Sequence, residues 1–366
     1  MRTEGERGPG RLKRTPEFEA IQDGASGVTI RDVAKKARVS LSSVSRVLTE
    51  HPDVSKQMRN RVMSAADSLG YEPHFIAQSL RRGVTHTLGF LIGDISNPVF
   101  ADVIRGAEDF ARARGYAVML TNSEGNPALD AEHLRLFLKR RVDGIMLSTA
   151  ETGSPEVARA LSNPTVPFVV LDRDTPPNSR VSTVYGDHAA GMREATAHLI
   201  NRGHRAIAMV SGSHHLKPAR ERIEGFRQAF KDAGLSPKED FIRTGTMRPE
   251  VGREETVRLL SLTEPPTAII AGSNRLMTGV LEGIHLANLT VGRDLALVGC
   301  DDVDLARLYI PAISVVVRDQ YRMGQVAGEL LLERLANPDA PIRSVTLPTR
   351  FVARASSDFA WPIAGR

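Results

Sequence analysis

The stretch TIRDVAKKARVSLSSVSRVL, residues 29–48, decides how the N-terminal part of this 366-residue chain folds. Its apolar residues recur every three or four positions on either side of a short interruption, which predicts two amphipathic helices joined by a tight turn. Thr29, with an aspartate three residues later, has the pattern of a capping box, and Ser40 is a suitable N-cap for the second helix. We therefore expect helices over about 30–37 and 41–48.

A third helix is predicted to begin at Ser55 and to end at Gly70, since apolar residues again follow at helical spacing and glycine commonly terminates helices. Two short helices joined by a tight turn form the helix-turn-helix arrangement, whose second helix lies in the major groove of DNA. The exposed face of the second predicted helix carries serines and Arg46, which suit contacts to phosphates and base edges. Taken without the rest of the pattern, such serines are more often ordinary surface.

The formal net charge of +5 comes from one short segment. Residues 28–86 contain ten Lys/Arg and five Asp/Glu, whereas residues 1–27 contain five of each and the rest of the chain contains 33 of each. A small basic module joined to a large neutral one is typical of a protein that contacts a polyanion, because phosphate contacts need cationic or other donors. The alternative is a solvated surface that happens to be basic.

Composition excludes several classes of protein. With 41% apolar and 25% charged residues the chain is neither collagenous nor wholly disordered, and its length favours two or three domains. No apolar run approaches the roughly eighteen residues of a membrane span, and no export signal is apparent, so we expect a cytoplasmic protein without a membrane partner. The single cysteine, Cys300, can form neither an internal disulfide nor a zinc site. Common catalytic and phosphate-binding motifs are missing, so we expect no cofactor, metal or catalysis.

From Thr87 onward, short apolar stretches alternate with amphipathic ones, which predicts an α/β fold of parallel sheets covered by helices. Ligands of such sheets bind beyond the carboxyl ends of the strands. Polar residues follow most of the predicted strands: Asp94, Ser96, Asn97, Asn122, Ser148, Asp172, Arg173, Ser211, Ser273, Asn274, Asp301 and Asp302. Each alone is more often a turn former or a helix cap, but together they favour a cleft for a small polar ligand.

Three segments carry a resemblance to a known family: the opening stretch, VSKQMRNRVMSAADSLGYEPH (54–74) and IAQSLRRG (76–83). They closely resemble the N-terminal signature of the lactose-repressor (LacI/GalR) family of bacterial transcription regulators, which has a three-helix helix-turn-helix head. The family commonly has glycine where this chain has Arg38. We therefore expect a slightly altered turn before the second helix.

The resemblance assigns roles to the second helix and its neighbours. It implies that Leu41, Ser42 and Arg46 read bases, while Ser43 and Ser45 hold the DNA backbone. The DNA-binding residues that it implies are Thr29, Leu41, Ser42, Ser43, Ser45, Arg46, His74, Ala77, Leu80 and Arg81.

Residues 73–86 resemble the hinge helix and linker of the family. Such a short helix is unstable alone in water, and in the family it orders on the operator and pushes a leucine into the minor groove. The resemblance implies that Leu80 is this wedge, with Ala77 beside it and Arg81 and Arg82 near phosphates. The alternative is a linker whose Leu80 merely covers the next domain.

The region after Thr87 resembles the periplasmic-sugar-binding-protein fold that the family uses as its effector domain, two similar lobes joined by three crossovers. VLDRD, HLINRGHR, ERIEGF and GCDDVDLARLYIPAIS are among the segments that carry this resemblance. It implies that Arg222 clamps an effector and that Asp301 is its acidic counterpart. Met247 stands where sugar-binding members often have an aromatic residue, and Ser273 replaces a frequent asparagine. The expected wall of the site consists of Phe100, Asn122, Asp172, Arg222, Met247, Asn274 and Asp301.

Together these inferences predict a DNA-binding transcription regulator, most simply a repressor, that acts as a homodimer on double-stranded pseudopalindromic operator DNA and responds to a sugar or related effector. The absence of a C-terminal heptad repeat favours dimers over tetramers. Alternatives left open are an enzyme, an exported binding protein and a cytoplasmic small-molecule binding protein without a DNA role. We expect five parts: a disordered arm (1–27), a helix-turn-helix domain (28–72), a hinge helix and linker (73–86), an effector-binding and dimerisation domain (87–355) and a tail (356–366). Within the effector-binding domain, the first lobe should consist of about 87–185 plus 316–345, and the second lobe of the remainder.

Overall fold

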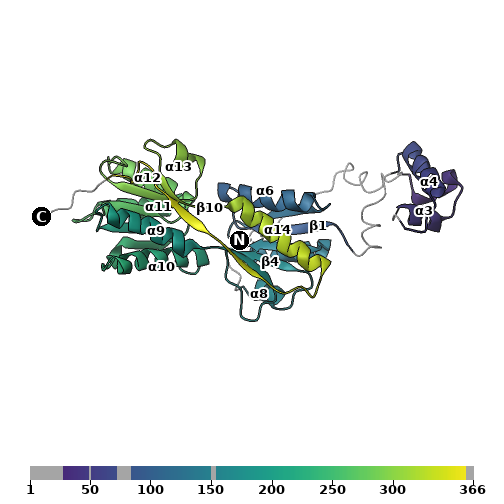
Figure 1. Cartoon of the computed structure of the whole chain (residues 1–366), viewed down its shortest axis with the longest axis horizontal. Helices are drawn as coiled ribbons and strands as arrows, with labels where there is room; N and C mark the ends of the chain where they lie inside the picture. Colours follow the sequence, from purple (N-terminus) through teal and green to yellow (C-terminus); the bar gives the residue numbers. More distant parts are fainter. Residues whose placement is uncertain (1–27, 49–50, 72–83, 150–153, 360–366) are drawn as a thin grey trace, which may run out of the picture. The chain divides into compact units, whose positions relative to one another are not determined.

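The computed structural model describes residues 28–48, 51–71, 84–149 and 154–359 (Figure 1). The chain divides into two compact units, Met1–Thr85 and His86–Arg366. Each unit has its own core. None of the helices within the described ranges is long and apolar enough to cross a membrane.

The first unit contains the three predicted helices, α2 (Ile30–Ala37), α3 (Leu41–Leu48) and α4 (Lys56–Leu69). Their apolar faces meet in a small core that includes Val33 and Val44, both fully buried. The caps form as the sequence predicts. The Asp32 carboxylate accepts hydrogen bonds from the amide and the hydroxyl of Thr29, at 2.9 and 2.7 Å. The hydroxyl oxygens of Ser40 and Ser55 accept amide hydrogen bonds at the starts of α3 and α4: Ser43 N to Ser40 Oγ at 3.1 Å and Met58 N to Ser55 Oγ at 3.2 Å.

Arg38 forms the turn between α2 and α3 and adopts the left-handed backbone conformation, with φ 49° and ψ 50°. Its amide donates to the carbonyl of Lys35 at 3.2 Å, and the amide of Val39 donates to that of Ala34 at 3.1 Å. The left-handed region costs a non-glycine residue roughly 1–2 kcal/mol. The turn therefore keeps a glycine-type geometry although the residue is arginine.

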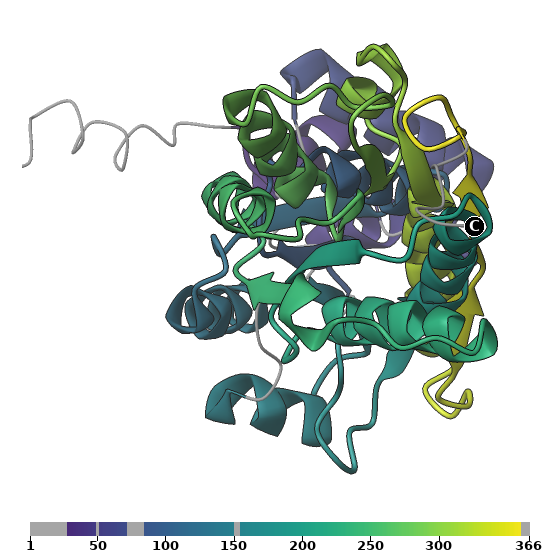
Figure 2. The ribbon, with the colours of Figure 1, turned by 90° about the vertical axis from the view of Figure 1, so that its left-hand side faces the viewer.

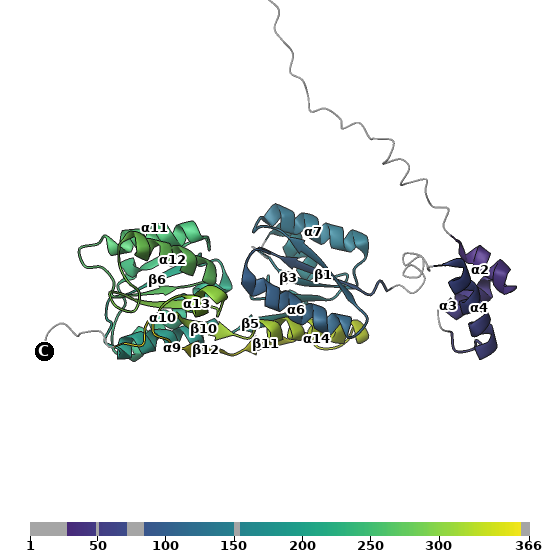
Figure 3. The ribbon, with the colours of Figure 1, turned by 90° about the horizontal axis from the view of Figure 1, so that it is seen from above.

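The second unit contains two lobes, each built on a six-stranded sheet (Figure 3). In the first sheet the strand order is β11-β5-β4-β3-β1-β2, and all of its pairs are parallel. Helices α6 and α14 bury one face of this sheet, and α7 and α8 bury the other. The elements of this lobe are β1 (Thr87–Ile92), α6 (Pro98–Arg112), β2 (Ala117–Asn122), α7 (Pro127–Arg140), β3 (Gly144–Ser148), α8 (Pro155–Ser162), β4 (Phe168–Leu171), β5 (Ser182–Gly186), α14 (Gln320–Ala336) and β11 (Ser344–Leu347).

The second sheet has the equivalent order, β12-β10-β9-β8-β6-β7, so the two lobes repeat one topology. Helices lie on both of its sides, as the view onto this lobe in Figure 2 shows, with α9 and α10 on one face and α11 and α12 on the other. The elements of this lobe are α9 (His188–Asn201), β6 (Ile207–Gly212), α10 (Lys217–Asp232), the 3-10 turn η1 (Glu239–Phe241), β7 (Ile242–Gly245), α11 (Pro249–Leu260), β8 (Ala268–Ala271), α12 (Asn274–Leu286), β9 (Ala296–Cys300), α13 (Asp304–Leu308), β10 (Ser314–Arg318) and β12 (Thr349–Val352).

The chain crosses between the lobes three times, after β5, after β10 and after β11. Two details correct the sequence-based expectation. The second crossing follows Arg318 rather than residue 316, because β10 completes the second sheet before α14 begins. The second sheet is also not wholly parallel, since β10 pairs with β12 antiparallel, with Val316 opposite Phe351.

Candidate ligand cavity and nucleic-acid interface

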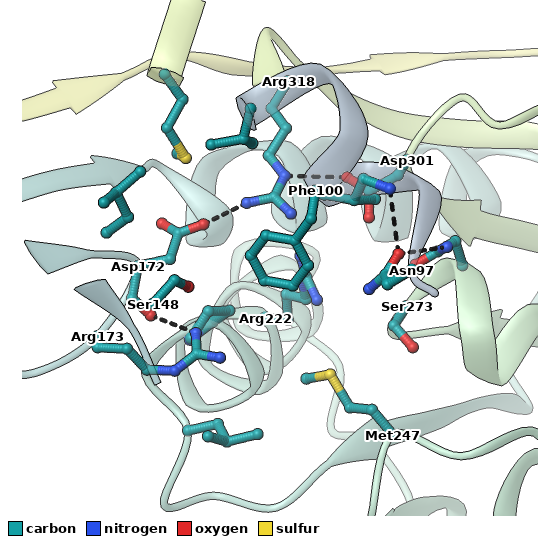
Figure 4. Close-up of a pocket in the computed structure, with 17 residues that line it drawn as sticks. Asn97, Phe100, Ser148, Asp172, Arg173, Arg222, Met247, Ser273, Asp301 and Arg318 are labelled. Carbon is teal, nitrogen blue, oxygen red and sulfur yellow. Dashed lines mark hydrogen bonds and ion pairs between the residues drawn. The ribbon is translucent and has the colours of Figure 1, made fainter. Parts of the chain in front are cut away.

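A cavity of about 90 Å³ lies between the two lobes, at the carboxyl ends of strands from both sheets (Figure 4). Charged, neutral polar and apolar side chains all contribute to its wall. It is lined by Asn97, Val99, Phe100, Val103, Ser148, Leu171, Asp172, Arg173, Leu216, Pro218, Arg222, Met247, Ser273, Asn274, Asp301, Arg318 and Met323.

The structure brings six of the seven expected wall residues together around this cavity. These are Phe100, Asp172, Arg222, Met247, Asn274 and Asp301. Asn122 does not line it, because β2 is the outermost strand of the first sheet. Its side-chain oxygen instead accepts the amide of Ile95 at 3.0 Å and so fixes the loop that follows β1.

Arg318 is the main cavity residue that the sequence analysis missed. It ends β10, is largely buried, and forms ion pairs with Asp172 of the first lobe and Asp301 of the second. The contact from its Nε to Asp301 Oδ1 measures 3.0 Å. Arg318 could have been recognised in the sequence as a candidate cavity residue, because it stands at the end of the apolar strand SVVVR, much as Asp172 directly follows another strand.

Asp172 and Asp301 occupy equivalent places, directly after β4 and β9, and both have a positive φ, of 49° and 68°. Burial alone raises the pKa of the Asp172 carboxyl, but His188, Arg318 and the amide of Gly186, which donates at 2.8 Å, lower it more. Burial likewise raises the pKa of Asp301, and the nearby charges of Arg318 and Arg222 reverse this effect. Both carboxylates are therefore ionised inside the protein.

His188 begins α9 at the first crossover and is almost fully buried between Asp172 and Arg222. Its Nε2 lies 3.2 Å from Asp172 Oδ1, and its Nδ1 lies 3.3 Å from Arg222 Nη2. Burial lowers the pKa of His188, and Arg222 lowers it further, against the opposing effect of Asp172. A neutral ring accepts from Arg222 at Nδ1, whereas its Nε2 lies close to Asp172 without forming a hydrogen bond of good geometry.

Arg222 and Arg173 direct guanidinium groups toward the cavity from opposite lobes. Arg222 Nη1 donates to the carbonyl of Gly272 at 2.5 Å. Arg173 donates from Nε to the carbonyl of Thr149 at 2.5 Å and from Nη1 to its neighbour's carbonyl at 2.8 Å. Backbone carbonyls therefore hold both side chains in place and leave guanidinium donors for a ligand.

Two sets of polar contacts join the lobes, and Asn97 and Asn274, which form one of them, also line the cavity. On one side Asn274 Nδ2 donates to Asn97 Oδ1 at 3.0 Å, and Arg275 donates to the hydroxyl of Ser96 at 3.0 Å. On the other side Arg220 contacts both carboxylate oxygens of Asp174, each at 3.0 Å. These bonds therefore join the two lobes.

In the first unit, the predicted DNA-facing side chains lie on the outer face of α3. Leu41 is 45% exposed although it is apolar, and Ser42 and Arg46 are also exposed, while Ser43 and Ser45 are half-buried.

The hydroxyl of Ser40 lies 2.7 Å from that of Ser42 and 2.8 Å from that of Ser43, so these three serines form one cluster at the start of α3. Thr29 is exposed at the start of α2. His74, Ala77, Leu80 and Arg81 lie outside the described residues.

The helix-turn-helix unit and the two-lobed unit both match known families. Residues 29–74 match the family of bacterial regulatory proteins named after lacI, and residues 196–357 match the periplasmic binding protein-like domain. The chain belongs to the LacI family of transcription regulators.

Individual relatives match nearly the whole chain. The ribose operon repressor of Escherichia coli strain K12 is 32% identical over 90% of this chain and 99% of its own length. The PurR transcriptional repressor of Glaesserella parasuis serovar 5 (strain SH0165) is 35% identical over 84% of this chain and 90% of its own. A solved LacI family regulator from Enterococcus faecium, with bound ribose, is 26% identical, with a TM-score of 0.66 over 75% of this chain and all of that one.

Proposed function

We propose that this chain represses transcription by binding a pseudopalindromic operator as a homodimer, and that a small polar effector bound between the lobes controls its affinity for DNA. The observation that carries the proposal is that one chain joins a basic helix-turn-helix unit to a two-lobed unit with a buried, charged cavity. A small-molecule binding protein without a DNA role would leave the exposed face of α3 unexplained.

The DNA-binding step is assigned to the exposed side chains of α3. Leu41 and Ser42 stand at the start of the helix, where a recognition helix meets base edges, and Arg46 is long enough to reach a guanine or a phosphate. Since the segment that carries these residues holds the whole net positive charge of the chain, phosphate contacts should contribute much of the affinity.

An exposed apolar strip supports self-association. Leu308 and Ile310, in and after α13, are 78% and 91% exposed, and Leu305 is 38% exposed. Contiguous apolar surface of this kind is typical of interaction sites. A second copy of the chain, related by a two-fold axis, would cover it and would present two recognition helices to the two halves of an operator.

Effector control requires the ligand to prefer one arrangement of the lobes. The cavity provides the means, because its charged residues come from both lobes and from the crossovers that join them. We propose no catalytic role for these residues, and we place the protein in the cytoplasm, where the chromosome is accessible.

Fluorescence anisotropy of the full chain on duplex DNA tests the proposed function. We expect the logarithm of the binding constant to fall linearly with the logarithm of salt concentration. Arg46→Ala should weaken binding to a selected operator by about 1–3 kcal/mol, whereas Arg140→Ala, on the exposed surface of α7, should leave it unchanged. Binding that is absent at low salt would contradict the proposal.

A further inference from the structure

We infer that the effector is a small organic anion, a polyol that carries a carboxylate or a phosphate, rather than an uncharged sugar. This inference rests on the proposed function and concerns the same cavity. It follows from which charged groups of the cavity already have partners within the protein.

The two carboxylates of the cavity are engaged by Arg318. Asp172 faces its Nη1, and Asp301 Oδ1 accepts from its Nε at 3.0 Å and from Gln320 Nε2 also at 3.0 Å. In Figure 4 the Arg318 guanidinium lies between the two acids. Asp172 Oδ1 has a further donor in the amide of Gly186 at 2.8 Å. Sugar hydroxyls need acceptors in order to donate, and Arg318 competes for the strongest ones in this site.

The other two arginines have neutral hydrogen-bond partners. Arg222 donates to the carbonyl of Gly272 and to the ring of His188, whose pKa burial lowers, so that it adds no positive charge. Arg173 donates to backbone carbonyls. Within the described parts of the chain, no ion pair joins a carboxylate to either guanidinium at contact distance. The cavity is therefore rich in donors for oxyanions.

The acidic residues around the cavity arginines do not remove the preference of Arg222 for a ligand oxyanion. Arg173 interacts electrostatically with Asp172 and, more weakly, with Asp130, which is buried on α7, so acidic groups already balance that arginine. Of the charged residues that line the cavity, three are arginines and two are aspartates. Both aspartates form ion pairs with the same arginine, Arg318. Arg222 interacts electrostatically with Asp301, but among the described residues it forms no ion pair at contact distance, so a ligand oxyanion would pair directly with its guanidinium, as the fork geometry of arginine favours.

The size of the cavity agrees with a compact charged group. A dry cavity of roughly 150 Å³ holds a benzene molecule, whereas this one measures about 90 Å³. A carboxylate or phosphate group fits in that space beside Arg222. A polyol attached to the anion would need the lobes to part at the contact between Asn97 and Asn274.

Calorimetric titration of the full chain with matched pairs of compounds tests the inference. The pairs are D-ribose with D-ribose 5-phosphate and D-glucose with D-gluconate, so that phosphate and carboxylate are compared separately with the neutral parent. We expect at least one anion to bind at least about tenfold more tightly than its parent, with an affinity that falls as salt rises. Neutral parents that bind as tightly as their anions, or more tightly, would overturn the inference.

Substitution of Arg318 provides a second test. Arg318→Gln removes the charge and keeps a donor for Asp301, so it should weaken anion binding by about tenfold or more and should strengthen binding of the neutral parents. Arg322→Gln is the matched control, since Arg322 lies four residues away on α14 and pairs with Glu329 on the surface. The inference fails if Arg318→Gln, verified to be folded by circular dichroism, keeps the anion preference of the unaltered chain.

DNA binding measured on the same samples separates the two claims. A chain that binds duplex DNA but prefers neutral sugars contradicts only the anionic effector. A chain that binds the anions but no duplex DNA contradicts the regulatory function and leaves the ligand class standing.

Discussion

Arg318 and Asp172 form an ion pair that joins the two sheets of the effector unit. Arg318 ends β10 of the second sheet, and Asp172 follows β4 of the first. Burial lowers the pKa of Arg318, but Asp301 and Asp172 raise it more, so the arginine stays charged. Since the pair lies in the wall of the cavity, the groups that contact a ligand also connect the lobes.

Loss of Arg222 should abolish the response to the effector and leave DNA binding in the absence of effector in place. Arg222→Ala removes a guanidinium from the cavity, which belongs to the unit His86–Arg366, and leaves the sequence of the helix-turn-helix unit unaltered. Operator binding with and without effector, followed by anisotropy, measures both effects. Arg227→Ala, which breaks only a surface pair with Glu239, is the control. A fully responsive Arg222→Ala protein would count against the cavity as the effector site.

Arg38→Gly should stabilise the helix-turn-helix unit by about 0.5–1 kcal/mol. The substitution relieves the left-handed conformation at φ 49°, and the greater freedom of glycine in the unfolded chain offsets part of the gain. Hydrogen exchange of the α2 and α3 amides in the full chain would slow correspondingly. Lys36→Gly, at an exposed position in the last turn of α2, should have the opposite effect, by up to about 1 kcal/mol. Faster exchange in Arg38→Gly would refute the strain at this turn.

Two glycines of α14 should differ in their tolerance of alanine. A Cβ at Gly324 would lie 1.9 Å from the carbonyl oxygen of Val103 on α6, whereas at Gly328 it would lie 3.0 Å from a ring atom of Phe110. Gly324→Ala should therefore destabilise the effector unit by about 2–3 kcal/mol, because the helix backbones must separate. Gly328→Ala should change stability much less, since a side chain can shift. Thermal unfolding compares the two, and equal losses would argue against the close helix contact.

Acid should destabilise the effector unit partly through His204. Burial lowers the pKa of this ring to about 4, while an unfolded histidine titrates near 6.5. Between these values the unfolded chain binds the proton and the native chain does not, so stability falls as pH decreases from about 6.5 to about 4. Over this range of pH the free energy of unfolding decreases by roughly 3 kcal/mol.

Unfolding followed at several pH values measures this effect. His204→Asn keeps a polar partner for Thr267 and should make the free energy of unfolding depend less on pH between about 6.5 and about 4. His285→Asn, at an exposed position of α12, is the control and should leave this dependence unchanged. A dependence on pH that His204→Asn leaves unchanged would contradict the assignment.

Local patterns predicted the elements of the helix-turn-helix unit well, because caps such as Ser55 and Gly70 act within one turn of the chain. They also placed the strands that directly precede Asp172 and Asp301, whose apolar runs are continuous. The strand Ile242–Gly245 is harder to recognise in the sequence, because it lies at the edge of its sheet and is only partly apolar.

The cavity was harder to predict than the fold. Asn122 and Ser148 are each the last residue of a strand, yet only the strand order decides that Ser148 lines the cavity and Asn122 does not. The role of Arg318 depends on a contact across 146 positions of sequence, to Asp172, which no local pattern contains. The left-handed turn at Arg38 depends on backbone geometry that the arginine itself disfavours.

Selection of duplexes from a random pool by the full chain tests the regulatory account most directly. The account predicts enrichment of an imperfect palindrome whose two halves lie about one helical turn apart, roughly 10 base pairs, since a two-fold dimer presents two copies of α3. It also predicts that Ser42→Ala and Arg46→Ala alter the enriched bases at symmetric positions. Enrichment of no common sequence, or of an asymmetric one that these substitutions leave unchanged, would contradict it.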